Sequence, residues 1–154
     1  MTNSTIKKPK NKHRIQRAKK GTQEFFTPDF IIDVMIDNCP EEMFRTLQPF
    51  HESCCGNGNI LEKVYKKYRE FHDHETALSA IYGFDFMPDN VMEAIRRLYG
   101  DGEIKRLDEI PEDMKSLGVI AVFTHNGVIV KNIICADALT YNISFGPDGM
   151  MSLV

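Results

Sequence analysis

Apolar residues recur along the chain at two different spacings, which predict alternating helices and strands. The helical spacing covers residues 28–38, 59–71 and 88–99, with Gly100 after the end of the third helix. Short apolar runs typical of strands cover residues 50–53, 80–86 and 132–137. Strands that alternate with helices indicate a mostly parallel sheet with flanking helices, so the predicted fold class is α/β.

A β-hairpin is also predicted in the second half of the chain. Asn126-Gly127 lies between two runs rich in β-branched residues, 119–123 and 128–130. A type I′ turn needs positive φ at both central residues, which Asn-Gly tolerates. The charged segment 101–118 is expected to be a loop with one helical turn from Pro111. At the start of the domain, Thr27 is expected to cap a helix whose first residue is Pro28.

The net charge of −3 conceals two very different parts of the chain. Residues 1–20 contain eight of the 19 basic residues and no acidic residue, whereas the remaining residues carry 11 basic and 22 acidic residues, a net charge of −11. We therefore divide the chain into a basic, disordered arm, 1–20, and one folded domain, 21–154. The arm either contacts DNA phosphates or is a solubilising tail.

The apolar runs and the cysteines lead to expectations about the location of the protein and the redox state of its thiols. No apolar run approaches the ~18 residues of a membrane span, and no apolar segment follows the N-terminal basic residues. We expect a cytoplasmic protein without membrane contact. The four cysteines, Cys39, Cys54, Cys55 and Cys135, form no C-x-x-C pair, so we expect reduced thiols and no metal site.

A glycine-rich segment, 52–61, follows the first expected strand and precedes a helix. Gly56 and Gly58 allow the backbone to turn tightly there and to approach a ligand closely. Glu52 would be unfavourable beside the pyrophosphate of a dinucleotide, but it favours the ammonium and sulfonium groups of S-adenosylmethionine. The segment therefore favours S-adenosylmethionine as the ligand.

Two further acids end the second and the third expected strands. An acid at the end of the second strand accepts both ribose hydroxyls in dinucleotide-binding folds, and we expect this of Asp85. Asp137 is placed to accept the adenine amine, with Phe86 and Ala138 in apolar contact with the ring. Each acid alone is explained equally well as a helix N-cap. Three acids that each close an expected strand favour a nucleoside site.

The segment 25–28, Phe-Phe-Thr-Pro, resembles the F/Y-x-T-P motif of N6-adenine DNA methyltransferases, which folds over the methionine end of the cofactor. The match is closest to the methylation subunits of type I restriction-modification systems and related phage and bacterial enzymes. Segments 52–61, 83–86 and 134–139 resemble the loop, ribose and adenine motifs of that family, with Ser53 in place of a proline. The resemblance implies a truncated, Rossmann-like S-adenosylmethionine-dependent methyltransferase fold. The cofactor-binding residues that it implies are Phe26, Thr27, Pro28, Glu52, Cys54, Gly56, Asn57, Gly58, Asn59, Asp85, Phe86, Asp137 and Ala138.

The catalytic motif of that family, Asn or Asp followed by Pro-Pro and an aromatic residue, has no counterpart in the 154 residues. It holds the flipped adenine, and none of the seven prolines adjoins another. We assign no catalytic residue and expect no methyl transfer by the isolated chain. Two interpretations stay open. The chain supplies the cofactor site of an adenine methyltransferase whose catalysis needs a partner chain, or it is a non-catalytic module that acts by association, for example on a restriction-modification complex.

The resemblance also leads to an expectation about assembly. In the complete methyltransferase fold, the strand before the glycine-rich segment lies next to the strand that carries the catalytic motif. Without that neighbour, the strand near Phe50 is expected at an open edge, and open edges recruit other chains. We expect a homo-oligomer or a complex with a protein partner. In a monomer, the 119–130 hairpin or the tail 141–154 would have to cover this edge.

Overall fold

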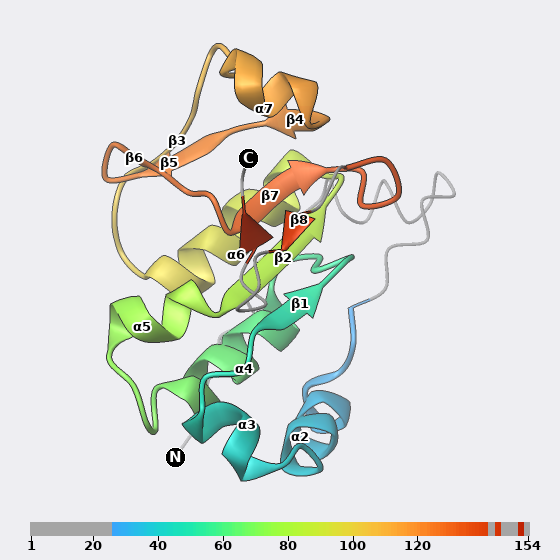
Figure 1. Ribbon diagram of the computed structural model, residues 1–154, viewed down its shortest axis with the longest axis vertical. Helices are drawn as coiled ribbons and strands as arrows, with labels where there is room; N and C mark the ends of the chain where they lie inside the picture. Colours follow the sequence, from blue (N-terminus) through green and yellow to red (C-terminus); the bar gives the residue numbers. More distant parts are fainter. Residues whose placement is uncertain (1–25, 142–143, 146–150, 153–154) are drawn as a thin grey trace, which may run out of the picture.

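The computed structural model describes residues 26–141 and the backbone of residues 144–145 and 151–152. The basic arm lies outside these residues. The helices are α2 (Asp29–Asp37), α3 (Glu41–Arg45), α4 (Asn59–Tyr68), α5 (His74–Ser79), α6 (Pro88–Tyr99) and α7 (Glu112–Ser116). The strands are β1 (Phe50–Glu52), β2 (Ile81–Asp85), β3 (Ile104–Arg106), β4 (Val119–Ala121), β5 (Phe123–His125), β6 (Val128–Ile129), β7 (Ile133–Ala136), β8 (Ser144–Phe145) and β9 (Met151–Ser152). One or two helices precede each strand as far as β4, and the described residues after β4 form strands β5 to β9 without a further helix (Figure 1).

The main sheet has the strand order β1-β2-β7-β4. β1 pairs with β2 in parallel, and β2 pairs with β7 in parallel. β4 runs antiparallel to β7, with an irregularity between Val119 and Ala121. The fold is therefore α/β with a mixed sheet and flanking helices. The three parallel strands are the three that the apolar runs predicted.

Side chains alternate between the two faces of the sheet, and each face has its own core. Ile81, Ile133 and Cys135 belong to the larger cluster, to which α2, α4, α5 and α6 also contribute. Phe84 and Ile134 belong to a smaller cluster that includes Met114 of α7. In Figure 1, α4 and α6 lie behind the main sheet. α7 lies next to β4 at the top of the view.

The predicted hairpin is confirmed, but its first strand is shorter than expected. Asn126 and Gly127 have φ of 49° and 81°, and β5 pairs with β6 across this turn. The apolar run 119–123 is divided between two sheets, because β4 joins the main sheet whereas β5 joins a small sheet of order β3-β5-β6. The expectation of a loop over 101–118 was wrong where β3 forms. β3 pairs with β5. The segment is charged and has no apolar periodicity, so its sequence does not reveal a strand there.

Two further local expectations differ from the structure. α2 begins at Asp29, with Pro28 at the N-cap position and no side-chain cap, so Thr27 does not cap the helix. Helix α5 had not been predicted. It is only six residues long, and Asp73 caps it by accepting a hydrogen bond from the backbone N–H of Thr76.

The strand β1 lies at the edge of the main sheet among the described residues, as expected. The 119–130 segment does not cover it, because β4 occupies the opposite edge beside β7. In the tail, β8 and β9 pair with each other, and most of the tail lies outside the described residues. No helix in the described part of the chain is long and apolar enough to cross a lipid bilayer.

Candidate functional site

A cavity of about 700 Å³ opens where the three parallel strands end. The carboxyl ends of parallel strands meet at one edge of a sheet, which is the usual position of ligand sites in such folds. Most residues implied by the resemblance line this cavity: Phe26, Thr27, Glu52, Cys54, Gly56, Asn59, Asp85, Phe86, Asp137 and Ala138. The other three, Pro28, Asn57 and Gly58, do not line it.

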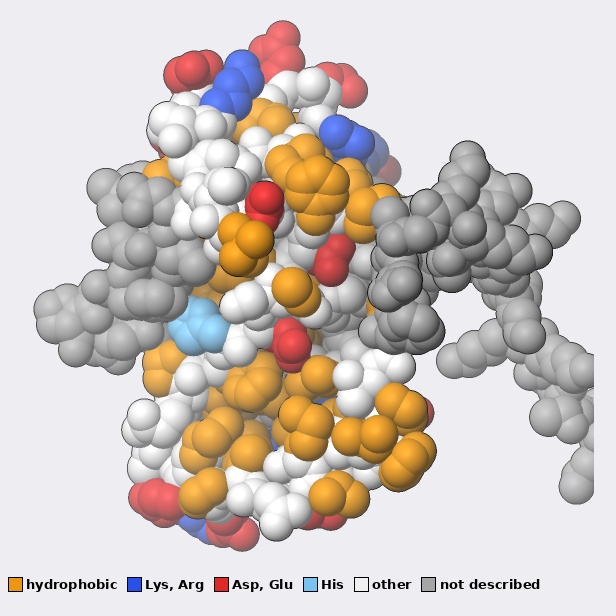
Figure 2. Space-filling view, turned by 90° about the vertical axis from the view of Figure 1, so that its right-hand side faces the viewer, with side chains coloured by type: hydrophobic (Ala, Val, Ile, Leu, Met, Phe, Trp, Pro, Cys, Tyr) orange, Lys and Arg blue, Asp and Glu red, His pale blue; other side chains and the backbone are white. Residues whose placement is uncertain are grey.

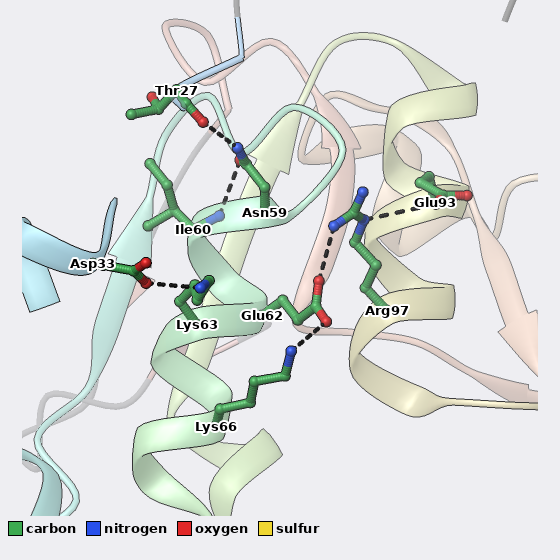
Figure 3. Close-up of polar contacts among 9 residues, drawn as sticks. All are labelled: Thr27, Asp33, Asn59, Ile60, Glu62, Lys63, Lys66, Glu93 and Arg97. Carbon is green, nitrogen blue, oxygen red and sulfur yellow. Dashed lines mark hydrogen bonds and ion pairs between the residues drawn. The ribbon is translucent and has the colours of Figure 1, made fainter. Parts of the chain in front are cut away.

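The segment before α2 lines the cavity through Phe26 and Thr27. Contacts to α4 hold this segment in place (Figure 3). The side-chain amide of Asn59 donates a 2.8 Å hydrogen bond to the carbonyl oxygen of Thr27. The Phe26 ring lies against the glycine-rich loop, because a β-carbon on Gly56 would be 2.9 Å from Cε1 of Phe26. One turn further along α4, Lys63 forms a 2.7 Å ion pair with Asp33 of α2. The first residues of α4 thus position the segment of Phe26 and Thr27 beside the cavity.

The glycine-rich loop uses its two glycines for different purposes. Gly56 has a φ of 53° and lines the cavity. Gly58 has a φ of 79°, and a β-carbon there would lie 2.7 Å from the β-carbon of Ala94 in α6. Gly58 therefore allows the loop to approach a neighbouring helix, rather than a ligand. Between them, Asn57 is 8% exposed, and its Oδ1 has no hydrogen-bond partner among the described residues.

Asp85 lines the cavity and also accepts hydrogen bonds from two neighbouring segments of the chain. Its Oδ2 accepts a 3.0 Å hydrogen bond from the backbone N–H of Gly56. Its Oδ1 accepts hydrogen bonds from the backbone N–H of Met87 at 2.8 Å and from Nδ2 of Asn90 at 3.2 Å. A carboxylate has about four acceptor positions, so about one is left for a ligand. Asp85 therefore fixes both the glycine-rich loop and the start of α6.

The third acid lies beside an apolar rim. Oδ1 of Asp137 accepts a 2.9 Å hydrogen bond from the backbone N–H of Leu139, so one carboxylate oxygen shapes the turn after β7. Phe86 and Leu139 line the cavity while 60% and 94% exposed, respectively. Together with Ala138, they form an apolar rim of the kind that accepts a planar ring.

Glu52 differs from the other two acids because its carboxylate accepts no hydrogen bond from the described residues, whereas those of Asp85 and Asp137 do. It ends β1 and lines the cavity, and no hydrogen bond or ion pair reaches its carboxylate from the described residues. Partial burial raises its pKa above the ordinary value, because desolvation penalises the charged form. No lysine, arginine or histidine is among the described residues that line the cavity. As far as the described residues form it, the site is therefore an acidic cavity without an internal counter-ion.

Sequence reasoning missed some residues that line the cavity: Ser53, Cys55, Ile60, Met87, Asn90, Ala136 and Leu139. Asn90 lies five residues after Asp85, in the first turn of the following helix. This spacing, which brings the two side chains to the same end of the sheet, was the signal from which its place at the cavity could have been predicted. Cys55 is buried beneath the loop, where its backbone N–H donates to the Phe84 carbonyl at 2.7 Å. Burial raises the pKa of its thiol, which is therefore an inert core group.

We compared the chain with protein-family models, with curated proteins and with solved structures, and none of the three comparisons gave a match. The arguments about function therefore depend on the geometry and the charge of the cavity.

Proposed function

We propose that the cavity binds S-adenosylmethionine and that the domain is the cofactor-binding part of a Rossmann-like, N6-adenine DNA methyltransferase. The supporting observation is a set of three carboxylates, Glu52, Asp85 and Asp137, in a cavity without a basic side chain among its described lining residues. An acidic cavity favours a ligand that carries positive charge and disfavours phosphate groups. S-adenosylmethionine has an ammonium group, a sulfonium group and no phosphate.

The arrangement of the cavity fits the parts of this ligand. The carboxylate of Glu52 lies at the end of β1, where an ammonium group would supply the missing counter-charge. The apolar rim of Phe86, Ala138 and Leu139 suits the adenine ring, next to Asp137 as an acceptor for its amine. Asp85 lies between these two regions in strand order and has acceptor capacity left for a ribose hydroxyl.

Isothermal titration calorimetry with four ligands tests this proposal. We expect the chain to bind S-adenosylmethionine, and to bind its product S-adenosylhomocysteine more weakly, because the product lacks the sulfonium charge that the acidic cavity attracts. We expect no measurable binding of ATP or NAD, whose phosphates would enter an acidic cavity. Binding of ATP in preference to S-adenosylmethionine would refute the proposal.

Glu52→Gln is expected to change ligand binding and stability in opposite directions. Because burial raises the pKa of Glu52, the free energy of unfolding of the unliganded domain falls as the pH rises from the ordinary glutamate pKa to the raised one, and the loss is complete above the raised pKa. At neutral pH the variant should melt at a higher temperature than wild type, and the difference should vanish at a pH below the ordinary glutamate pKa. Its affinity for S-adenosylmethionine should fall roughly tenfold, about 1.4 kcal/mol, through loss of the charge attraction.

The control for this prediction is Glu109→Gln, because Glu109 is exposed and lies outside the cavity. Scanning calorimetry should find its melting temperature unchanged across the same pH range. If Glu52→Gln lowered the stability at neutral pH, Glu52 would have a structural partner and would not be a group reserved for a cation.

We also propose that the isolated chain does not methylate DNA. The residues that line the cavity supply a cofactor site, and the sequence contains no Pro-Pro-aromatic motif to hold a flipped adenine. Incubation with tritiated S-adenosylmethionine and unmodified DNA should give no label in adenine. Cofactor-dependent labelling would show that other residues of this chain hold the base, and would exclude a purely associative role.

A further inference from the structure

Helix α2 has apolar side chains on two faces, only one of which is buried. Ile32 and Ile36 point into the core against α4. The opposite side, which we call the outer face of α2, consists of Phe30, Ile31, Val34 and Met35, which are 69%, 40%, 59% and 48% exposed. Figure 2 shows hydrophobic side chains gathered on the lower part of the molecule, at the level of α2 in Figure 1. Such a group on a soluble protein marks an interaction site.

A row of acids runs along one side of the outer face. Asp29, Asp33 and Asp37 are spaced four residues apart, so they form a row next to Phe30 and Val34. Asp33 pairs with Lys63, whereas Asp29 and Asp37 have no ion-pair partner among residues 26–141. A partner that fits this surface needs an apolar patch and basic residues beside it.

We propose that the outer face of α2 is a dimer interface, and that its occupant is the same face of a second copy. A second copy offers the required apolar surface in its own Phe30, Ile31, Val34 and Met35. It also brings the required basic residues, because residues 1–20 carry eight basic and no acidic side chains and precede α2 in the chain. This proposal does not depend on the ligand of the cavity.

The lengths and areas agree with this arrangement. Nine residues make α2 about 13 Å long, whereas 20 residues of extended chain span up to ~65 Å. The arm of one copy can therefore follow the acid row of the other. The outer face offers a few hundred Å² of apolar surface, less than the ~800 Å² per partner of a standard interface. The apolar contact alone is therefore too small for a stable interface, and the arm must contribute further contacts. Because those contacts are between charges, the dimer should be weak and sensitive to salt.

Sedimentation velocity of the full chain, from low micromolar to several hundred micromolar protein, tests the interface. Wild type should show a monomer–dimer equilibrium that weakens between about 50 mM and about 500 mM salt. The double variant Phe30→Ser/Val34→Ser should raise the dissociation constant at least tenfold. Its matched control is Val128→Ser, because Val128 of β6 is 71% exposed and lies on another element, and this variant should dimerise as wild type does. Melting temperatures of both variants should match wild type, since the replaced side chains are exposed.

A double-mutant cycle tests the contact between the arm and the acid row. Asp29→Asn/Asp37→Asn should weaken the dimer several-fold at low salt. The quadruple variant Arg14→Gln/Arg17→Gln/Lys19→Gln/Lys20→Gln should do the same. If the two groups contact each other, combining both sets should have no larger effect than either alone. A wild-type chain that remains monomeric at every concentration would overturn the proposal, as would a dimer that survives Phe30→Ser/Val34→Ser. Additive effects in the cycle would overturn the placement of the arm.

Discussion

Replacing Gly58 by alanine is expected to lower the free energy of unfolding by about 2–5 kcal/mol, more than any other single substitution that we propose. The residue has a φ of 79°, a left-handed conformation that costs a side chain ~1–2 kcal/mol. The added β-carbon would lie 2.7 Å from the β-carbon and 2.8 Å from the α-carbon of Ala94. Because one of these atoms is backbone, either α6 or the loop must move, at a cost of ~1–3 kcal/mol. Urea denaturation of both proteins measures the difference.

Gly127→Ala is the matched control for this experiment. Gly127 has a φ of 81°, but a β-carbon there meets no atom within 4 Å. The control should therefore lose only the conformational part, ~1–2 kcal/mol. Equal losses in the two variants would show that the contact between Gly58 and Ala94 costs nothing, and that the loop is free to move away from α6.

The cavity was predictable from sequence because its residues lie at the ends of recognisable strands. Glu52, Asp85 and Asp137 each follow an apolar run of a few residues, and parallel strands bring such ends to one edge of a sheet. Once β1, β2 and β7 are parallel neighbours, the meeting of the three acids follows from backbone geometry. No knowledge of side-chain packing is needed.

The reason why position 58 requires a glycine could not be predicted in the same way. A glycine in a loop before a helix is consistent with contact to a ligand or with contact to protein, and the sequence does not distinguish them. The deciding atom belongs to Ala94, 36 positions later, on another helix. Contacts between residues so far apart depend on how α4 packs on α6.

The division of the apolar run 119–123 was also beyond prediction. β4 and the first residue of β5 belong to one continuous apolar run, 119–123, so periodicity indicates one strand. The chain nevertheless changes sheets at Val122, where β4 pairs with β7 and β5 pairs with β3 and β6. The partner β3 comes from a charged segment, whose strand character arises from pairing and not from its own hydrophobicity.

The hydrogen bond that Asp85 accepts from the glycine-rich loop was not predicted, and it affects how the proposed role of Asp85 in ligand binding must be tested. Asp85 was expected either to bind ribose or to cap a helix. In the structure its carboxylate accepts hydrogen bonds from Gly56, Met87 and Asn90 while it lines the cavity. A variant that loses ligand binding therefore needs a companion measurement of stability before the loss is attributed to the ribose.

Asp85→Asn is expected to abolish most ligand binding and also to destabilise the domain. An amide has only one acceptor oxygen, so its NH₂ group would face either the backbone N–H of Gly56 or the donors on Met87 and Asn90. Loss of one charge-assisted hydrogen bond costs ~1.5–3 kcal/mol, which equals at least a tenfold loss of affinity if a ribose hydroxyl shares the carboxylate. Calorimetric titration with S-adenosylmethionine and urea denaturation measure the two effects separately.

The control is Asp137→Asn, which keeps an oxygen to accept from the N–H of Leu139 and should therefore unfold like wild type. Its affinity for S-adenosylmethionine should fall less than that of Asp85→Asn, because Asp137 lies at the proposed adenine end and, among the described residues, makes no hydrogen bond to the glycine-rich loop. Hydrogen exchange at Gly56 distinguishes the two roles of Asp85, because its amide proton is protected by the bond to Oδ2. If Asp85→Asn left this protection and the affinity both unchanged, Asp85 would neither order the loop nor bind the ligand, and the proposed ribose site would have to be abandoned.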